Sequence, residues 1–304
     1  MRGDGDGWVI GENGTRHWGK HGAAGLLLRA PSSGPSSSGE PMVLLQHRAL
    51  WSHQGGTWAL PGGARDSHES TAHAAVREAQ EEAGISAEQV SVRSERVTAS
   101  VESGWSYTTV VADTDHPLTT VPNGESTELR WVPESIVDEL PLHPGFASSW
   151  PSLRTVPLRV LLDTANVLGS RPNGWWKDRA GSTGALLTSL AETLPRTVEL
   201  PSGQYGWLTR IEAVLEGQAR DAVVDDPRTR TILADGSGDD TLADQANLDG
   251  DLTALVTADR GLRDRLPESV QVLTPSTVLA WLQGSRPGAP APTNERPPAG
   301  PGLR

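Results

Sequence analysis

Apolar and polar segments alternate over the first 145 residues in a way that predicts a strand-rich domain with two helices. Short apolar runs and β-branched alternation predict strands, which we place at 22–29, 42–46, 57–60, 90–101, 107–112 and 129–132. Residues 70–83 predict a central helix. Pro133 opens a second helix toward Leu140, because proline suits the first helical position. We therefore expect strands packed around one central and one late helix.

The pattern changes after residue 157, where apolar strands begin to alternate with helices. The predicted strands are 159–163, 222–224, 231–234, 255–259 and 270–273. The predicted helices are 182–194, 207–220, 240–250, 261–266 and 275–282. Alternation of this kind favours a parallel sheet whose strands are joined by helical crossovers. The second half is therefore predicted to be an α/β domain of its own.

Composition marks the boundaries between these regions. Residues 1–16 are rich in Gly and Asp and are expected to be flexible, and residues 17–145 form the first domain. A Pro- and Ser-rich stretch predicts a linker at 146–157, followed by the second domain at 158–283. Residues 284–304 are rich in Pro, Gly and Arg and are expected to be a disordered tail.

The overall composition excludes several classes of protein. The chain has no cysteine, which excludes disulfides, zinc–thiolate sites and a thiol nucleophile. No apolar run approaches the ~20 residues that span a bilayer, and the N-terminus lacks the form of a signal peptide. We therefore expect a cytoplasmic protein without a membrane partner. The net charge of −12 argues against capture of nucleic acid by the whole surface. Only two lysines among 26 basic residues indicate a GC-rich, bacterial coding bias.

The most informative stretch is residues 63–85, which follow the pattern G-x5-E-x7-R-E-A-x-E-E-x-G-I. It places Glu78, Glu81 and Glu82 at positions i, i+3 and i+4 of the central helix, so that their side chains share one face. Like charges at this spacing destabilise a helix by roughly 0.2–0.5 kcal/mol per pair. A hard cation such as Mg²⁺ removes the conflict, because carboxylate oxygens are its preferred ligands.

This pattern resembles the signature box of the Nudix hydrolases at every defining position. The resemblance implies an α/β/α sandwich over 17–145 that hydrolyses a nucleoside diphosphate linked to another moiety, with Mg²⁺ or Mn²⁺. It further implies roles for individual residues. The metal ligands would be Glu78, Glu81, Glu82 and the carbonyl of Gly63. Arg77 would orient Glu78, Glu69 would brace the loop, and Gly84 would end the helix in a left-handed turn.

Residues outside the box complete this expectation. In Nudix proteins a glutamate from the region before the last strand often supplies a further metal contact or the catalytic base. Glu125 and Glu128 both lie there, and the sequence does not decide between them or between these and a glutamate of the box. Arg48 precedes the box where the family often contacts phosphates, so it is a candidate substrate-binding residue.

A second group of acids lies at strand ends in the C-terminal half. Asp163 ends the first strand with Asn166 three residues on, Asp239 and Asp240 open a helix, and Asp259 follows a late strand. Such ends converge in a parallel sheet, and converging acids repel unless a divalent cation lies between them. This set resembles the PIN/NYN-like nuclease domains, which implies a PIN-like α/β/α fold and Mg²⁺-dependent cleavage of RNA.

Three interpretations of the chain follow from these features. In the first, the Nudix half is the enzyme and a nucleotide is its partner. In the second, the C-terminal domain cuts RNA while the Nudix half trims or senses nucleotides. In the third, the C-terminal domain is a non-catalytic binding module, with Asp239 and Asp240 as helix caps and Asn166 as a turn residue. The pattern does not define an oligomeric state.

Overall fold

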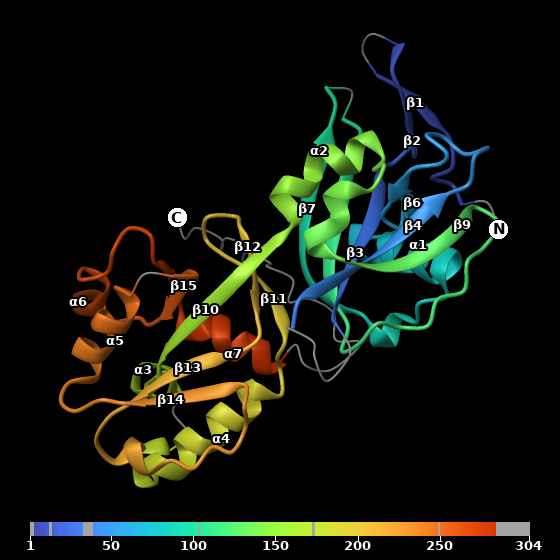
Figure 1. The fold of residues 1–304 in the computed structure, drawn as a ribbon. Helices are drawn as coiled ribbons and strands as arrows, with labels where there is room; N and C mark the ends of the chain where they lie inside the picture. Colours follow the sequence, from blue (N-terminus) through green and yellow to red (C-terminus); the bar gives the residue numbers. More distant parts are fainter. Residues whose placement is uncertain are drawn as a thin grey trace, which may run out of the picture.

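The computed structural model describes residues 3–11, 14–32, 39–102, 104–171, 174–248 and 250–283. Two sheets with their own helices form the two halves of the chain, coloured blue to green and green to red in Figure 1. The long strand β10 (Thr155–Asp163) leads from the first half into the second (Figure 1). The predicted disordered tail, 284–304, lies outside the described residues. None of the described helices is long and apolar enough to cross a membrane.

The N-terminal sheet is mixed and is built around β3 (Ala23–Pro31). Its strand order is β5–β4–β3–β8–β7, with β6 paired to β3 and β9 paired to β4. β3 runs parallel to β8 and antiparallel to β4 and β6. The other strands are β4 (Pro41–Arg48), β5 (Trp58–Ala59), β6 (Gly62–Ala64), β7 (Ser91–Ser100), β8 (Ser106–Asp113) and β9 (Ser126–Pro133).

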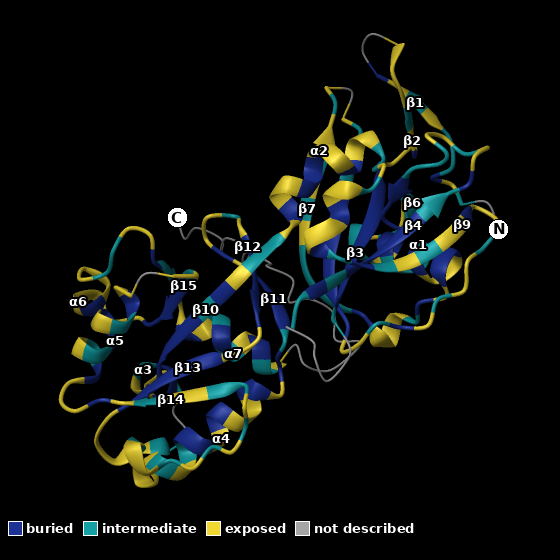
Figure 2. Ribbon diagram, viewed as in Figure 1, coloured by how far each residue is buried: buried dark blue, intermediate teal, exposed yellow. Residues whose placement is uncertain are grey.

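Both faces of this sheet are covered, because alternate residues of β3 belong to different hydrophobic clusters. Leu26 and Leu28 pack with the alanines of α1 (Thr71–Ala83) on one face. Leu27 packs on the other face with Trp150 of α2 (Pro144–Leu153). Figure 2 shows the buried strands between these helices. The predicted α/β/α sandwich is therefore present, with short 3-10 helices η2 (Ala87–Gln89) and η3 (Glu134–Glu139) beside it.

Two segments of the first half differ from the sequence prediction. The stretch expected as a linker at 146–157 contains most of α2 and the start of β10. Phe146, Trp150 and Leu153 are buried at helical spacing, and this pattern outweighs the local Pro and Ser content. Part of the segment expected to be flexible, 1–16, lies in a hairpin of β1 (Trp8–Ile10) and β2 (Arg16–Trp18).

The C-terminal half contains the predicted parallel sheet, with β10 at its centre. β15 (Leu252–Val256) and β13 (Ile211–Leu215) flank β10, and β16 (Gln271–Leu273) and β14 (Thr229–Leu233) lie outside them, all in parallel. After β10, the chain adds β13 and β14 on one side of it and then β15 and β16 on the other side. β10 therefore lies where the strand order reverses, which is where ligands bind in open α/β sheets.

Helices cover both faces of the second sheet. Val160 and Leu162 of β10 pack in one cluster, and Leu161 packs in the other. The helices on the first face are α3 (Thr164–Gly169), α4 (Arg179–Ala191) and α7 (Pro275–Gln283). Those on the second face are α5 (Gly238–Ala246) and α6 (Arg260–Arg263). The short helices η4 (Trp175–Lys177) and η5 (Gly217–Asp221) lie in the connections.

The prediction of a helix at 207–220 is wrong, and so is the strand predicted at 222–224. Residues 205–208 form β12, and Ile211–Leu215 forms β13, both fully buried. Residues 222–224 form no regular element. A strand buried on both faces reads as a continuous apolar run, and periodicity alone does not separate such a run from a buried helix.

A hairpin of the second half joins the two halves. β11 (Arg196–Glu199) and β12 (Tyr205–Leu208) pair in antiparallel fashion and contact β7 and β8. The buried Asp113 accepts hydrogen bonds from both the backbone and the hydroxyl of Thr197, at 2.8 and 2.6 Å. The guanidinium of Arg96 lies 4.3 Å from the ring centroid of Tyr205, whose ring is buried in the N-terminal cluster. The halves therefore share a core.

Candidate functional site

Helix α1 holds the three glutamates in a fixed position. Ser70 caps its N-terminus by accepting a hydrogen bond from the backbone of His73. Gly84 ends it in the predicted left-handed conformation, with φ of 71°. The alanine face of the helix is buried against β3 and β8, and Glu82 is buried together with these alanines. Glu78, Glu81 and Glu82 lie in the last two turns.

Arg77 connects the loop to the glutamates. Its guanidinium donates to both carboxylate oxygens of Glu69, at 2.8 and 3.1 Å, in a bidentate pair. The same group donates to Glu78 at 2.8 Å and to the carbonyl of Ala64 at 3.0 Å. Glu81 lies 3.6 Å from it and is the most exposed of the three glutamates. Arg77 therefore joins Glu69 and the Ala64 carbonyl of the loop to Glu78 on the helix.

The two less exposed glutamates pack against the glycines of β6. Glu82 accepts a hydrogen bond from the backbone of Gly62 at 2.8 Å. A Cβ on Gly63 would lie 2.6 Å from the carboxylate of Glu78, so that a side chain at this position would displace it. Gly63 therefore leaves the space in which the Glu78 carboxylate lies, and the backbone of Gly62 holds the Glu82 carboxylate.

Burial perturbs both carboxylates strongly. It raises the pKa of Glu78 to about 7, against the opposing effect of Arg77. Burial likewise raises the pKa of Glu82 to about 8, against the hydrogen bond from Gly62. Glu125 adds to both shifts by repulsion. A buried set of carboxylates with too few positive neighbours fits a divalent cation, which would displace the protons and neutralise the charge.

The structure separates the two glutamates that the sequence left equivalent. Glu125 lies close enough to Glu78 and Glu82 to influence both. Glu128 instead pairs with Arg130 at 2.7 Å on the exposed surface of β9. Arg48 lies near the glutamates as well, because its charge lowers the pKa of Glu82. Glu125 and Arg48 are therefore within electrostatic reach of the buried glutamates, whereas Glu128 is paired with Arg130.

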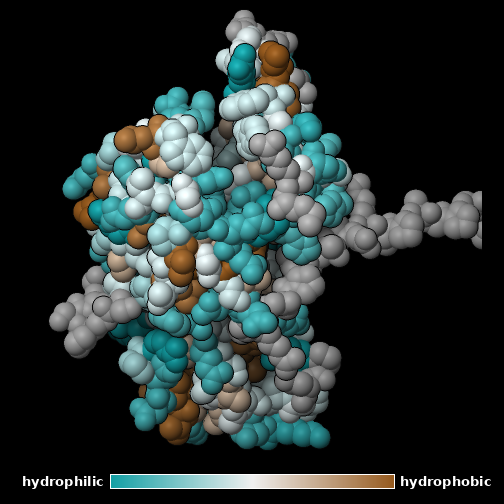
Figure 3. Space-filling model, turned by 90° about the vertical axis from the view of Figure 1, so that its right-hand side faces the viewer, coloured by the Kyte–Doolittle hydropathy of each residue, from teal (hydrophilic) through white to brown (hydrophobic). Residues whose placement is uncertain are grey.

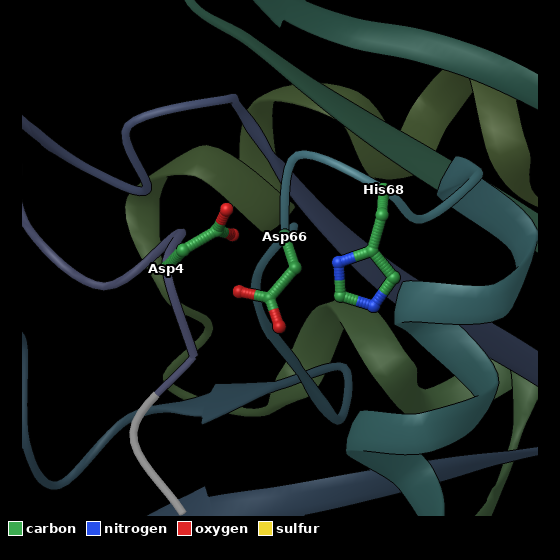
Figure 4. Close-up of side chains that lie close together, drawn as sticks. All are labelled: Asp4, Asp66 and His68. Atoms are coloured by element: carbon green, nitrogen blue, oxygen red, sulfur yellow. The ribbon is translucent and has the colours of Figure 1, made fainter.

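A separate group near the loop before α1 brings three potential metal-ligand atoms together. The carboxylates of Asp4 and Asp66 and a ring nitrogen of His68 lie within 4.8 Å of one another, a spacing that the α1 glutamates do not reach. Figure 4 shows Asp4 on the N-terminal segment beside the other two on the loop. Asp4 accepts hydrogen bonds from Ser67, and Asp66 accepts one from Gly5. These carboxylates therefore hold the N-terminal segment on the loop.

Four of the five predicted residues in the second half lie together. Asp163, Asn166, Asp239 and Asp259 line a hollow of about 500 Å³ at the carboxyl ends of the parallel strands. Asp163 accepts hydrogen bonds from the backbone of Asn166 and from the hydroxyl of Thr257. Burial raises its pKa, and Asp239 adds to the shift. The structure therefore brings these four residues together at one end of the sheet.

Asp240 is the exception, and Glu216 is the residue that the sequence missed. Asp240 forms an ion pair with Arg265 at 2.7 Å and does not line the hollow. Glu216 lines it, raises the pKa of Asp163 and Asp239, and accepts a hydrogen bond from the backbone of Gly238 at 2.8 Å. It follows the buried strand β13 as Asp163 ends β10, but the helix predicted at 207–220 concealed this signal.

Known proteins match the N-terminal half and part of the C-terminal half. The family model described as "NUDIX domain" matches residues 20–154. A Mycobacterium tuberculosis protein named "Putative 8-oxo-dGTP diphosphatase 3" is 53% identical over 213 residues, which cover 69% of this chain and 86% of that protein. The 213 aligned residues outnumber residues 1–154, so this similarity must continue beyond the C-terminal end of the family match.

Two further relatives match a shorter part. A Bifidobacterium longum protein named "Nucleoside triphosphate pyrophosphatase/Nudix hydrolase fusion protein" is 41% identical over 152 residues, covering 48% of this chain and 30% of that protein. The crystal structure of the Nudix hydrolase RenU from M. smegmatis is 65% identical. It covers 49% of this chain and 93% of its own, with a TM-score of 0.47.

Proposed function

The chain belongs to the Nudix hydrolase family and is a pyrophosphohydrolase acting on nucleoside diphosphate derivatives, and from this premise we propose which residues carry the reaction. We propose that Glu78, Glu81 and Glu82 hold Mg²⁺ or Mn²⁺ and that the pyrophosphate bond is cleaved beside them. The observation that carries the proposal is the pair of buried carboxylates against Gly62 and Gly63. Their raised pKa values favour a cation as the partner.

The residues around the glutamates have separate tasks in this proposal. Bound there, the cation would neutralise phosphate oxygens and lower the pKa of an attacking water. Arg77 keeps the Glu78 carboxylate in one orientation, and Glu69 in turn fixes Arg77. Gly63 leaves room for the carboxylate, and its carbonyl would be a further ligand of the cation. Arg48, a cation near Glu82, would bind the phosphates of the substrate.

Glu125 is the candidate base. Its charge acts on both buried carboxylates and it holds no ion pair in the described part of the chain, whereas Glu128 is paired with Arg130. A general base must reach the proton that it takes, and only Glu125 of this pair lies near the glutamates. Glu125 would therefore accept the proton of the attacking water, and Glu128 would have no part in the reaction.

A substrate panel tests this proposal. The panel contains 8-oxo-dGTP, ADP-ribose, NAD and diadenosine tetraphosphate, and each is incubated with the full chain with and without Mg²⁺. We expect cleavage of 8-oxo-dGTP to 8-oxo-dGMP, because the mycobacterial relative bears the name of that activity. Chromatography of the products identifies the bond that is broken. Release of inorganic phosphate alone, or cleavage unaffected by EDTA, would contradict the proposal.

We propose as a second candidate function that the hollow of the C-terminal half is a Mg²⁺-dependent RNA-cleaving site. The observation that favours it is the convergence of Asp163, Asp239, Asp259 and Glu216 at the point where the strand order reverses. Like charges at one site favour a shared cation that could activate water. The Nudix half would then trim or sense the nucleotides released.

This second candidate is tested on the full chain, because the two halves share a core. Single-stranded RNA is incubated with Mg²⁺, and we expect cleavage that Asp163→Asn reduces by about 100-fold, a loss of roughly 2.7 kcal/mol of transition-state stabilisation. Asp240→Asn is the matched control, because its carboxylate pairs with Arg265 outside the hollow. Absence of cleavage with no calorimetric signal for Mg²⁺ at the Asp163 site would leave the C-terminal half as a non-catalytic binding module.

A further inference from the structure

The N-terminal hairpin lies outside the family-matched segment and has one face fixed on the protein. Trp8 pairs with Trp18 across its strands, and Val9 pairs with His17 on the opposite face. The ring of His17 lies 4.5 Å from that of Trp105, between β7 and β8. The indole of Trp105 also donates to the carbonyl of Trp18 at 3.0 Å. The His17 face therefore packs inward and the tryptophan face is turned outward.

The outward face carries an exposed aromatic pair. The rings of Trp8 and Trp18 meet edge to face at 5.2 Å, with 47% and 40% of their surfaces exposed. Figure 3 shows that the hairpin, at the top of the view, also exposes aliphatic surface, in keeping with the 68% exposure of Ile10. Large rings left open to water in a rigid arrangement gain little for folding, so that they indicate a contact made with another molecule.

The aromatic pair continues toward the α1 glutamates. The ring of His53 lies 6.0 Å from Trp8 and 6.2 Å from the ring of His143. Arg48 donates to the carbonyl of His53 at 3.1 Å, and the backbone of the adjacent Ala49 donates to the carbonyl of Glu125 at 2.9 Å. The same segment reaches α1, where the backbone of Asn123 donates to the carbonyl of Glu82 at 3.3 Å. A row of rings thus leads from the hairpin to the arginine beside the proposed metal ligands.

The segment that precedes the hairpin is also fixed to the protein. The backbone of Gly5 donates to Asp66 at 2.7 Å, and the backbone of Ser67 donates to Asp4 at 2.9 Å. The segment that leads into the hairpin is thereby tied to the loop that begins the box. The distance between the hairpin and α1 is therefore set by the fold, and the row can act as one wall of the same site.

We propose that Trp8 and Trp18 bind the nucleobase of the nucleotide whose pyrophosphate bond the α1 glutamates cleave. The inference rests on the proposed function, because it takes the phosphates to lie near Arg48 and Glu82. With the phosphates there, the nucleoside lies along the row of His143 and His53, and its heteroaromatic ring meets the tryptophans. Stacking on an aromatic side chain tolerates different bases, so the pair would favour nucleotides over other pyrophosphates.

The test compares a nucleotide with the same polyphosphate lacking its base. Kinetic constants are measured for 8-oxo-dGTP and for 2-deoxyribose 5-triphosphate. We expect Trp8→Ala to raise KM for 8-oxo-dGTP by about 10-fold or more, as loss of a stacked ring predicts. It should leave kcat within about twofold and leave KM for the abasic compound unchanged. Trp8→Phe should keep most of the affinity, because it retains a ring.

Controls separate base binding from other roles. Trp176→Ala removes an exposed tryptophan of the other half and should change neither substrate. An equal loss with both substrates, or no change in KM with Trp8→Ala, would overturn the proposal. A change in the molecular mass in solution on Trp8→Ala would also overturn it, because Trp8 and Trp18 would then be an interface between copies of the chain. Calorimetry compares the binding of 8-oxo-dGMP with that of 2-deoxyribose 5-phosphate, and so measures base binding by Trp8 and Trp18 without any cleavage. Failure to cleave 8-oxo-dGTP would instead refute the proposed function.

Discussion

Glu82→Gln is expected to reduce pyrophosphate cleavage by roughly 100- to 1,000-fold, equivalent to about 3–4 kcal/mol of transition-state stabilisation. The amide is the same size and can still accept the hydrogen bond from Gly62, but it removes a charged metal ligand. Because Glu82 is 4% exposed and burial opposes its charge, the variant should fold at least as stably as the wild type. Mg²⁺-dependent turnover and thermal melting measure the two effects.

Glu88→Gln is the matched control for this change. Glu88 lies on η2, shortly after α1, and is exposed, so the same chemical substitution there should leave turnover unaltered. Turnover of Glu82→Gln within about threefold of the wild type would remove this carboxylate from the mechanism, since the loss of a charged ligand should cost more than the ~0.7 kcal/mol this represents.

Glu134→Ala is expected to destabilise the protein by about 3–5 kcal/mol, because it would leave a buried arginine charge without its partner. Arg29 is fully buried and donates to Glu134 at 2.5 Å. The other carboxylate oxygen accepts from the backbone and hydroxyl of Thr155, at the start of β10. The change therefore weakens both the N-terminal core and the junction of the halves. We expect the melting temperature to fall by about 10 °C.

An exposed ion pair on the same 3-10 helix supplies the control. Asp138 lies 3.5 Å from Arg154 with both side chains more than half exposed, so Asp138→Ala should cost less than about 1 kcal/mol. The double variant Arg29→Met with Glu134→Leu should recover most of the stability, because a buried pair can be replaced by apolar groups of similar size. If Glu134→Ala melts like Asp138→Ala, the buried pair contributes nothing specific.

The sequence predicted the N-terminal site well because most of that site is local. Glu78, Glu81 and Glu82 share a face through helical spacing alone, and Arg77 lies one residue from the first of them. Glu69 and Gly63 belong to the loop that leads into the same helix, where Arg77 reaches both Glu69 and the adjacent Ala64 carbonyl. A short helix and its entry loop fix these positions without help from the rest of the fold.

The second half was harder to predict for a physical reason. β13 is buried between two parallel neighbours, so its residues carry no alternation that would distinguish a strand from a helix. The wrong assignment concealed Glu216, which contributes to the acidic hollow. Asp240 was misplaced because adjacent residues at a helix start point in different directions. Asp239 faces the hollow, and Asp240 reaches Arg265.

The sequence by itself determined the family, the helix that carries the glutamates and the acidic strand ends, because each depends on spacing within one element. Only the tertiary structure distinguishes Glu125 from Glu128, because Glu128 pairs with Arg130 whereas the charge of Glu125 acts on the buried glutamates. It likewise placed Trp8 beside His53, which lies 45 positions later in the chain. Contacts between distant segments depend on strand order and register, and no local pattern encodes these.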